Sequence, residues 1–207
     1  MVKIIAPSWK IEPVDGIAML KRIEEAGRTC YKSEGKISDR SYVGFIRMII
    51  ESGHESILEH EKVTIRLLCD RGVTHEIVRH RIASYSQEST RYCNYSQDKF
   101  GSEITVINPN SFMDGTQYQI WEEAMHAAEK FYMDLIKLKC PPQIARSVLP
   151  NSLKTEIVIT YNLREWRHFF RLRTSKAAHP QMREITLPLL AEFKRLMPIV
   201  FDDIVPQ

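Results

Sequence analysis

A segment in the first half of the chain concentrates side chains that can hold an anion. It reads Arg79-His80-Arg81-Ile82-Ala83-Ser84-Tyr85-Ser86-Gln87-Glu88-Ser89-Thr90-Arg91. Arginine presents a planar fork that grips a phosphate through two parallel hydrogen bonds. The hydroxyl groups and the glutamine amide can complete a shell around a phosphate or a pyrimidine. The segment therefore predicts a site for a small phosphorylated ligand.

A run of basic residues is also typical of a solvated helix face or of a general nucleic-acid-binding patch. Two features of the segment argue against both alternatives. The basic residues alternate with Ile82, Ala83 and Tyr85, and the acidic Glu88 lies inside the run. This mixture indicates a partly buried site.

Length and composition limit the class of protein. With 207 residues, 43% of them hydrophobic and 27% charged, we expect one globular domain over residues 1–207, or a core with a smaller helical lobe. A net charge of +3 is too small to indicate a nucleic-acid partner. The four cysteines contain no Cys-x-x-Cys pair, and no leader-like segment opens the chain, so we expect a reduced, cytoplasmic protein. No apolar run approaches the ~18 residues that cross a bilayer, and we expect no membrane partner.

The apolar periodicity alternates between strand and helix, which predicts a mixed α/β fold with a central sheet, packed helices and a smaller helical lobe. Strands are expected at residues 2–6, 63–69, 104–107 and 155–161. Helices are expected at residues 15–27, from a cap at Ser38 to a stop at Gly53, at 72–81, at 117–139, from Pro142 to Pro150, and at 163–174.

Helical spacing also predicts which side chains point inward. In the first helix these are Ile17, Leu20 and Ala26. In the long helix the expected inward set is Ile120, Ala124, Ala128, Phe131, Leu135 and Leu138.

The helix after Asn162 places a cation among aromatic side chains. Asn162 is a good cap, and Glu165 stands three residues later, in the capping-box position. Arg173 shares a face with Trp166 and Phe169. A guanidinium there needs an anionic or carbonyl partner, and a bound ligand is one candidate. The alternative is that the side chain extends to solvent or forms a salt bridge with an Asp or Glu.

Several metal and nucleotide motifs fail on spacing. His75 and His80 lie five residues apart, so on a helix they point about 140° apart and cannot share a zinc ion. His54, Glu55, Glu59 and His60 are typical of a helix start, and we expect no metal. Neither a Rossmann glycine motif nor a P-loop occurs, so side chains must hold any phosphate.

Four blocks of the chain together resemble one enzyme family, the flavin-dependent thymidylate synthases. Arg-His-Arg followed after seven residues by Ser is the characteristic motif of this family, and it stands at residues 79–89. Residues 52–60, SGHESILEH, are similar to its G-H-E-[ST]-x-x-E-H element. Residues 145–150, ARSVLP, and residues 162–173, with N-x-R and a later L-R, are similar to two further elements.

The resemblance implies a homotetrameric enzyme that forms dTMP from dUMP with FAD as cofactor, methylene tetrahydrofolate as carbon donor and NADPH as reductant. In this family reduced flavin delivers hydride, and the uracil ring is activated electrostatically rather than by a cysteine. The implied flavin contacts are Ser56, Glu59, Arg79, His80, Arg81, Asn162, Arg164 and His168. The implied nucleotide contacts are Glu76, Gln87, Glu88, Ser89, Thr90, Arg91, Arg146 and Arg173, and Arg173, which would favour the ionised pyrimidine N3, is the implied catalytic residue.

A second class of function stays open. A binding or regulatory protein of this fold could keep the nucleotide arginines and lose hydride chemistry, whereas an unrelated basic module would need neither Arg146 nor Arg173. Retention of all four blocks favours the enzyme.

Overall fold

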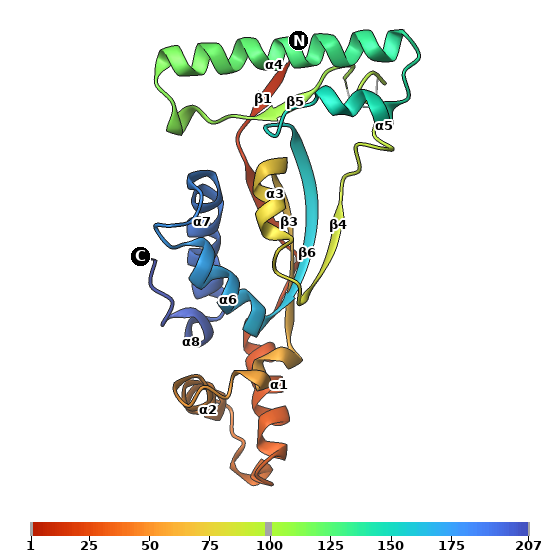
Figure 1. The fold of residues 1–207 in the computed structure, drawn as a ribbon. Coiled ribbons are helices and arrows are strands. Elements are labelled where there is room, and N and C mark those ends of the chain that lie inside the picture. Colours follow the sequence, from red (N-terminus) through yellow and green to blue (C-terminus); the bar gives the residue numbers. More distant parts are fainter. Residues whose placement is uncertain (1, 98–100, 207) are drawn as a thin grey trace. The chain divides into compact units, whose positions relative to one another are not determined.

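The chain folds into two compact units whose segments are interleaved along the sequence. The structure, a computed structural model, describes residues 2–97 and 101–206 (Figure 1). Unit 1 consists of residues 1–8, 67–79 and 86–158, and unit 2 of residues 9–66, 80–85 and 159–207. In the described part of the chain, no helix combines the length and the apolar character needed to cross a membrane.

The strands form two sheets. Four strands pair in the order β2 (Ser8–Ile11), β3 (Lys62–Asp70), β6 (Lys154–Asn162) and β4 (Ala83–Gln87). Two more, β1 (Lys3–Ile5) and β5 (Thr105–Ile107), pair in parallel, with Lys3 opposite Thr105. The predicted strands at residues 63–69 and 155–161 are confirmed, since β3 and β6 bury alternate side chains. Strands β2 and β4 were not predicted, because both are short and their side chains are only partly buried.

Unit 1 packs helices around a small apolar core. Its helical elements are α3 (Arg71–Ile77), η4 (Asn110–Phe112), α4 (Gly115–Lys137), α5 (Pro142–Ala145) and η5 (Arg146–Val148). The core contains Val2, Tyr95, Ile104, Val106, Met125, Tyr132, Ala145 and Leu153. Helix α3 ends at Ile77, earlier than the predicted residue 81. Pro142 begins α5 as predicted, but the helix ends before Arg146, which caps it.

The predicted inward face of the long helix α4 is wrong in part, since Leu135 packs against the core as expected but three other predicted residues do not. Ile120, Phe131 and Leu138 are 65%, 54% and 80% exposed, whereas Met125 and Tyr132 are buried. The helix carries two apolar stripes, and the stripe with Met125 and Tyr132 packs against the core. A hydrogen bond fixes this contact, since the backbone N–H of Tyr95 donates to the Tyr132 hydroxyl at 3.3 Å. Periodicity detects both stripes and cannot rank them.

Unit 2 is built on helices and an aromatic cluster. Its elements are α1 (Gly16–Thr29), η1 (Glu34–Lys36), α2 (Ser41–Glu51), η2 (Glu55–His60), α6 (Leu163–Arg173), α7 (Pro180–Leu196) and α8 (Pro198–Phe201). The rings of this cluster, all buried, belong to Tyr161, Trp166, Phe169, Phe170, Phe193 and Phe201. Trp166 anchors α6 to β3, because its Nε1–H donates to the Val63 carbonyl at 3.0 Å. Helices α7 and α8 were not predicted.

In unit 2, helices α1 and α2 each differ from the sequence prediction at one boundary. Gly27 does not end α1, which continues to Thr29. The prediction that Ile17 points inward is also wrong, since its side chain is 56% exposed. The glycine is needed for packing, because a Cβ there would lie 2.4 Å from the Phe45 ring. Ser38 does not cap α2: Arg40 is the N-cap residue, and Ser38 exchanges two hydrogen bonds with the Ser41 hydroxyl instead.

Candidate functional site

A pocket of about 390 Å³ opens in unit 2 at the start of α6. It is lined by Glu55, Glu59, Ile82, Asn162, Arg164, Glu165, His168 and Arg171. Four of the residues that the resemblance implies for flavin therefore share one cavity: Glu59, Asn162, Arg164 and His168. Its volume lies in the range of small-molecule sites.

Local structure explains how α6 presents these side chains. Asn162 caps the helix, since its side chain accepts a hydrogen bond from the Glu165 N–H at 2.8 Å. Arg164, His168 and Arg171 follow at spacings of four and three residues, which puts them on one helix face. Arg164 Nη1 donates to Glu59 Oε1 of η2 at 2.6 Å. The pocket therefore has arginine forks along one wall.

The other implied flavin residues lie outside this lining. Ser56 is exposed on η2, and Arg79 and Arg81 are exposed on either side of His80. His80 itself is only 4% exposed. The structure thus gathers half of the implied set around the pocket.

A buried hydrogen-bond chain runs through His80. Glu165 Oε1 lies 2.8 Å from Nδ1 of His80, and Arg173 Nε donates to Nε2 at 3.2 Å. Because a carboxylate only accepts, Nδ1 carries the ring proton and Nε2 accepts from the guanidinium. Burial lowers the pKa of His80, and Arg173 lowers it further; the hydrogen bond to Glu165 opposes this shift without reversing it, so the ring stays neutral. The predicted capping-box role of Glu165 is wrong, because its carboxylate bonds His80.

The same chain decides whether a metal could bind. Among the described residues, ligand atoms of His80, Glu165 and His168 lie within 4.8 Å of one another. Both ring nitrogens of His80 are already engaged, so its imidazole has no lone pair left for an ion. We interpret the cluster as a hydrogen-bond chain that holds Arg173.

Two tyrosines fix the backbone at His80. The Tyr85 hydroxyl donates to the His80 carbonyl at 2.5 Å and lies 2.8 Å from the Tyr161 hydroxyl. Because the Tyr85 hydroxyl proton is already donated to the His80 carbonyl, the Tyr161 hydroxyl is the donor in the hydrogen bond between the two tyrosines. Burial raises the pKa of both phenols, so both stay neutral.

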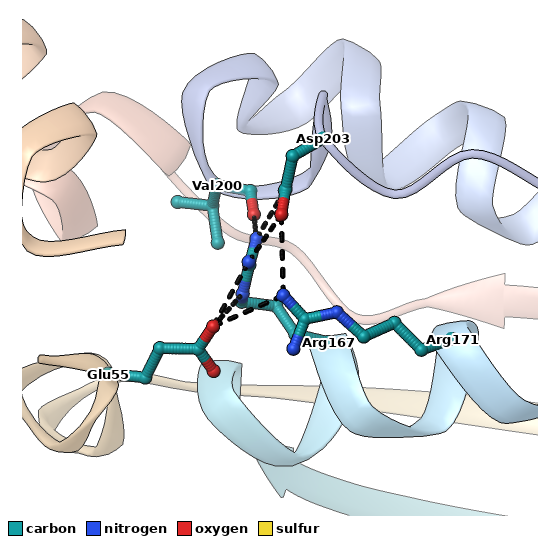
Figure 2. Close-up of polar contacts among 5 residues, drawn as sticks. All are labelled: Glu55, Arg167, Arg171, Val200 and Asp203. Carbon is teal, nitrogen blue, oxygen red and sulfur yellow. Dashed lines mark hydrogen bonds and ion pairs between the residues drawn. The ribbon is translucent and has the colours of Figure 1, made fainter. Parts of the chain in front are cut away.

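Beside the pocket, a buried arginine joins η2 to the C-terminal end of the chain (Figure 2). Arg167 is fully buried and donates to Glu55 Oε1 at 3.2 and 3.1 Å, to both oxygens of Asp203 at 2.7 Å, and to the Val200 carbonyl. Burial opposes ionisation of Asp203, but the bonds from Arg167 outweigh it and hold the pKa of that carboxyl below its usual value. Sequence reasoning missed this network.

The implied nucleotide residues other than Arg173 belong to unit 1. Arg146 Nη1 donates to the buried Thr90 hydroxyl at 3.0 Å, and Ser89 Oγ accepts from the Arg91 N–H at 3.3 Å. Gln87 Nε2 donates to the hydroxyls of Thr74 and Thr155 at 3.1 and 3.2 Å.

Glu88 is held by two neighbours in unit 1. Its carboxylate accepts from Lys154 Nζ at 2.6 Å and from the Tyr95 hydroxyl at 3.0 Å. Glu76 lies on α3. The structure therefore brings Thr90 and Arg146 together, and Lys154 and Tyr95 hold Glu88 in place.

Comparison with known proteins places the geometry in context. Residues 17–199 match the family described as thymidylate synthase complementing protein. The flavin-dependent thymidylate synthase of Pyrococcus abyssi is 34% identical over 205 residues, covering 97% of this chain and 83% of that protein. The one from Geobacter sulfurreducens is 36% identical over 188 residues, covering 87% and 80%. The UMP/dUMP methylase PolB of Streptomyces cacaoi shares the fold, with a TM-score of 0.78, 22% identity, and coverage of 97% and 95%.

Proposed function

Because this chain belongs to the thymidylate synthase complementing protein family, whose relatives include flavin-dependent thymidylate synthases, we propose that it converts dUMP to dTMP. Methylene tetrahydrofolate is the proposed carbon donor and NADPH the proposed reductant. The enzyme is a flavin-dependent methyltransferase. The observation that carries the proposal is the unit 2 pocket, in which four family positions for flavin line one cavity.

The residues of the pocket fit FAD chemically. Arg164 offers a guanidinium fork to phosphate groups, and Asn162 and His168 add polar atoms. When bound, FAD supplies hydride transfer between the nicotinamide and the pyrimidine. Ser56, Arg79, His80 and Arg81 complete the proposed flavin set by family correspondence.

The nucleotide is assigned to the remaining family positions. Arg146 and Thr90, joined at 3.0 Å, are proposed phosphate or sugar ligands together with Glu76, Gln87, Glu88, Ser89 and Arg91. Arg173 is proposed to stabilise negative charge on the pyrimidine. Its Nε is held by His80, and such a preoriented cation needs little reorganisation when charge develops on the ring.

A homotetramer is also proposed, with residues 1–207 acting as one domain. The exposed apolar side chains along α4 and at its C-cap, Ile120, Phe131 and Leu138, support self-association, since exposed apolar surfaces commonly mark contacts between proteins. The interleaved segments of the two units support a single functional domain. The free cysteines Cys30, Cys69, Cys93 and Cys140 support a reducing, cytoplasmic location.

Colour and product formation test the function. Purified protein should show the absorption band of oxidised flavin, and NADPH should bleach the band under anaerobic conditions when dUMP is present. Isotope-labelled dUMP should become dTMP only when methylene tetrahydrofolate is added. A colourless protein that FAD cannot reconstitute, yet that binds dUMP, would favour the nucleotide-binding alternative.

Thermal melts with and without FAD, combined with light scattering, test the assembly. If flavin binding and tetramer formation are linked, FAD should raise the melting temperature and the tetramer should be the species that binds it. A monomer that binds FAD at full stoichiometry would contradict the assembly.

A further inference from the structure

Arg171 lies in the pocket wall, between the N-x-R and L-R positions that carry the family resemblance and outside both. Its side chain is 46% exposed and reaches the pocket from the same helix face as Arg164 and His168. Figure 2 shows its guanidinium beside Glu55 and Asp203. Nη2 makes long contacts to Glu55 Oε1 at 3.2 Å and to Asp203 Oδ2 at 3.3 Å.

The two carboxylates do not depend on Arg171. Arg167, fully buried beneath them, donates two bonds to Asp203 at 2.7 Å and two to Glu55 at 3.1 and 3.2 Å. If Arg171 turns away, Glu55 and Asp203 therefore each stay hydrogen-bonded to Arg167. The exposed, long contacts of Arg171 are also the weakest kind of ion pair.

The other charges in the pocket lining are already matched. Glu59 accepts from Arg164 at 2.6 Å, and Glu165 is bonded to His80, whose other ring nitrogen accepts from Arg173. Within the described residues, Nε and Nη1 of Arg171 make no hydrogen bond. Arg171 is thus the cation in the lining that can turn toward a ligand at least cost.

We propose that Arg171 is an anion-binding residue of this pocket, which loosens its contact with Glu55 or Asp203 and grips a phosphate group of the bound flavin. The inference rests on the flavin function proposed above. A guanidinium fork matches a phosphate through two charge-assisted hydrogen bonds, and the partial exposure of the side chain gives it room to move.

A series of three flavins tests the proposal. FAD and FMN carry phosphate, whereas riboflavin has the same ring system without it. Arg171→Ala should weaken the affinity for FAD and FMN by about ten- to a hundredfold, the effect of losing hydrogen bonds to a charged group. Its affinity for riboflavin should match that of the wild type. Arg171→Lys should recover part of the loss, since it restores the charge without the fork.

Arg195→Ala is the matched control, because Arg195 is an exposed arginine on α7 that is paired with Glu192 outside the pocket lining. It should leave all three affinities unchanged. The role of Arg171 would be overturned if Arg171→Ala lost as much affinity for riboflavin as for FAD, or if its FAD affinity were unchanged. It would also be overturned if the variant differed from the wild type only in its use of NADPH relative to NADH. Wild-type protein that binds none of the three flavins would instead overturn the flavin function, and this inference with it.

Discussion

Glu165 and His80 lie eighty-five residues apart in the sequence, yet a hydrogen bond of 2.8 Å joins Oε1 of the carboxylate to Nδ1 of the ring. This contact sets the tautomer of His80 and so makes Nε2 the acceptor for Arg173. A residue at the start of α6 thereby orients one at its end. The burial of the ring, which lowers the pKa of His80 although the bond to Glu165 opposes this, predicts how stability depends on pH.

The stability of the protein should fall as the pH drops below about 6.5, the ordinary pKa of histidine. Burial lowers the pKa of His80 in the folded state, so between that value and the unfolded one the unfolded chain binds the extra proton. Stability therefore rises with pH across this window and is flat above it. Urea denaturation from pH 5 to 8 measures the slope, and His80→Gln should reduce it. An unchanged slope in His80→Gln would refute the assignment.

Arg167→Ala should lower the free energy of unfolding by about 3–5 kcal/mol, because it leaves Glu55 and Asp203 without their buried partner. Arg66→Ala breaks a partly exposed pair with Glu12 and should cost less than about 1 kcal/mol. Chemical denaturation of both variants gives the comparison. Equal losses would show that the buried network contributes nothing special to stability.

Two glycines of unit 2 should respond in opposite directions to alanine. Gly27→Ala places a methyl group within 2.4 Å of Phe45 and should destabilise the protein by about 1–3 kcal/mol. Gly44→Ala, in α2, meets nothing within 4 Å and should stabilise it by up to about 1 kcal/mol. Melting temperatures of the two variants decide the matter, and a stabilising Gly27→Ala would contradict the close α1–α2 packing.

Arg173→Ala should lower turnover about a hundredfold or more, the usual effect of losing one oriented charge-stabilising donor, while FAD affinity changes little. Arg173→Lys should rescue little, because a point charge lacks the planar fork that His80 holds. Steady-state dTMP formation and flavin titration measure the two effects separately. Normal dTMP formation by Arg173→Ala would remove the proposed role.

Ser89→Ala should weaken dUMP binding by about three- to tenfold and leave measurable dTMP synthesis, because we expect Ser89 to be a hydrogen-bonding ligand and not a nucleophile. A serine needs a base to remove its proton, and the ring nitrogens of His80 are both engaged with other groups. Mass spectrometry of the wild type with dUMP should find no covalent adduct. An adduct, or total loss of activity with intact binding of dUMP and FAD, would overturn this assignment.

The sequence by itself determined the family and the elements with a strong local pattern. Motifs of fixed spacing at residues 79–89 and 145–150 identified the family, and period-two burial located β3 and β6. Asn162 marked the start of α6 because a cap is a local interaction between neighbours in the chain. Such features need no knowledge of distant residues.

The tertiary structure decided which surfaces and charges meet. Helix α4 has two apolar stripes of similar period, and only packing against Tyr95 and its neighbours selected the one with Tyr132. The sequence placed Glu165 in a capping-box position, but its carboxylate instead forms a hydrogen bond with the buried imidazole of His80, eighty-five residues away. No sequence pattern singled out Arg167, whose two carboxylate partners, Glu55 and Asp203, lie far from it along the chain. Long-range partners of this kind leave no periodic trace, because their geometry is set by the packing of whole elements.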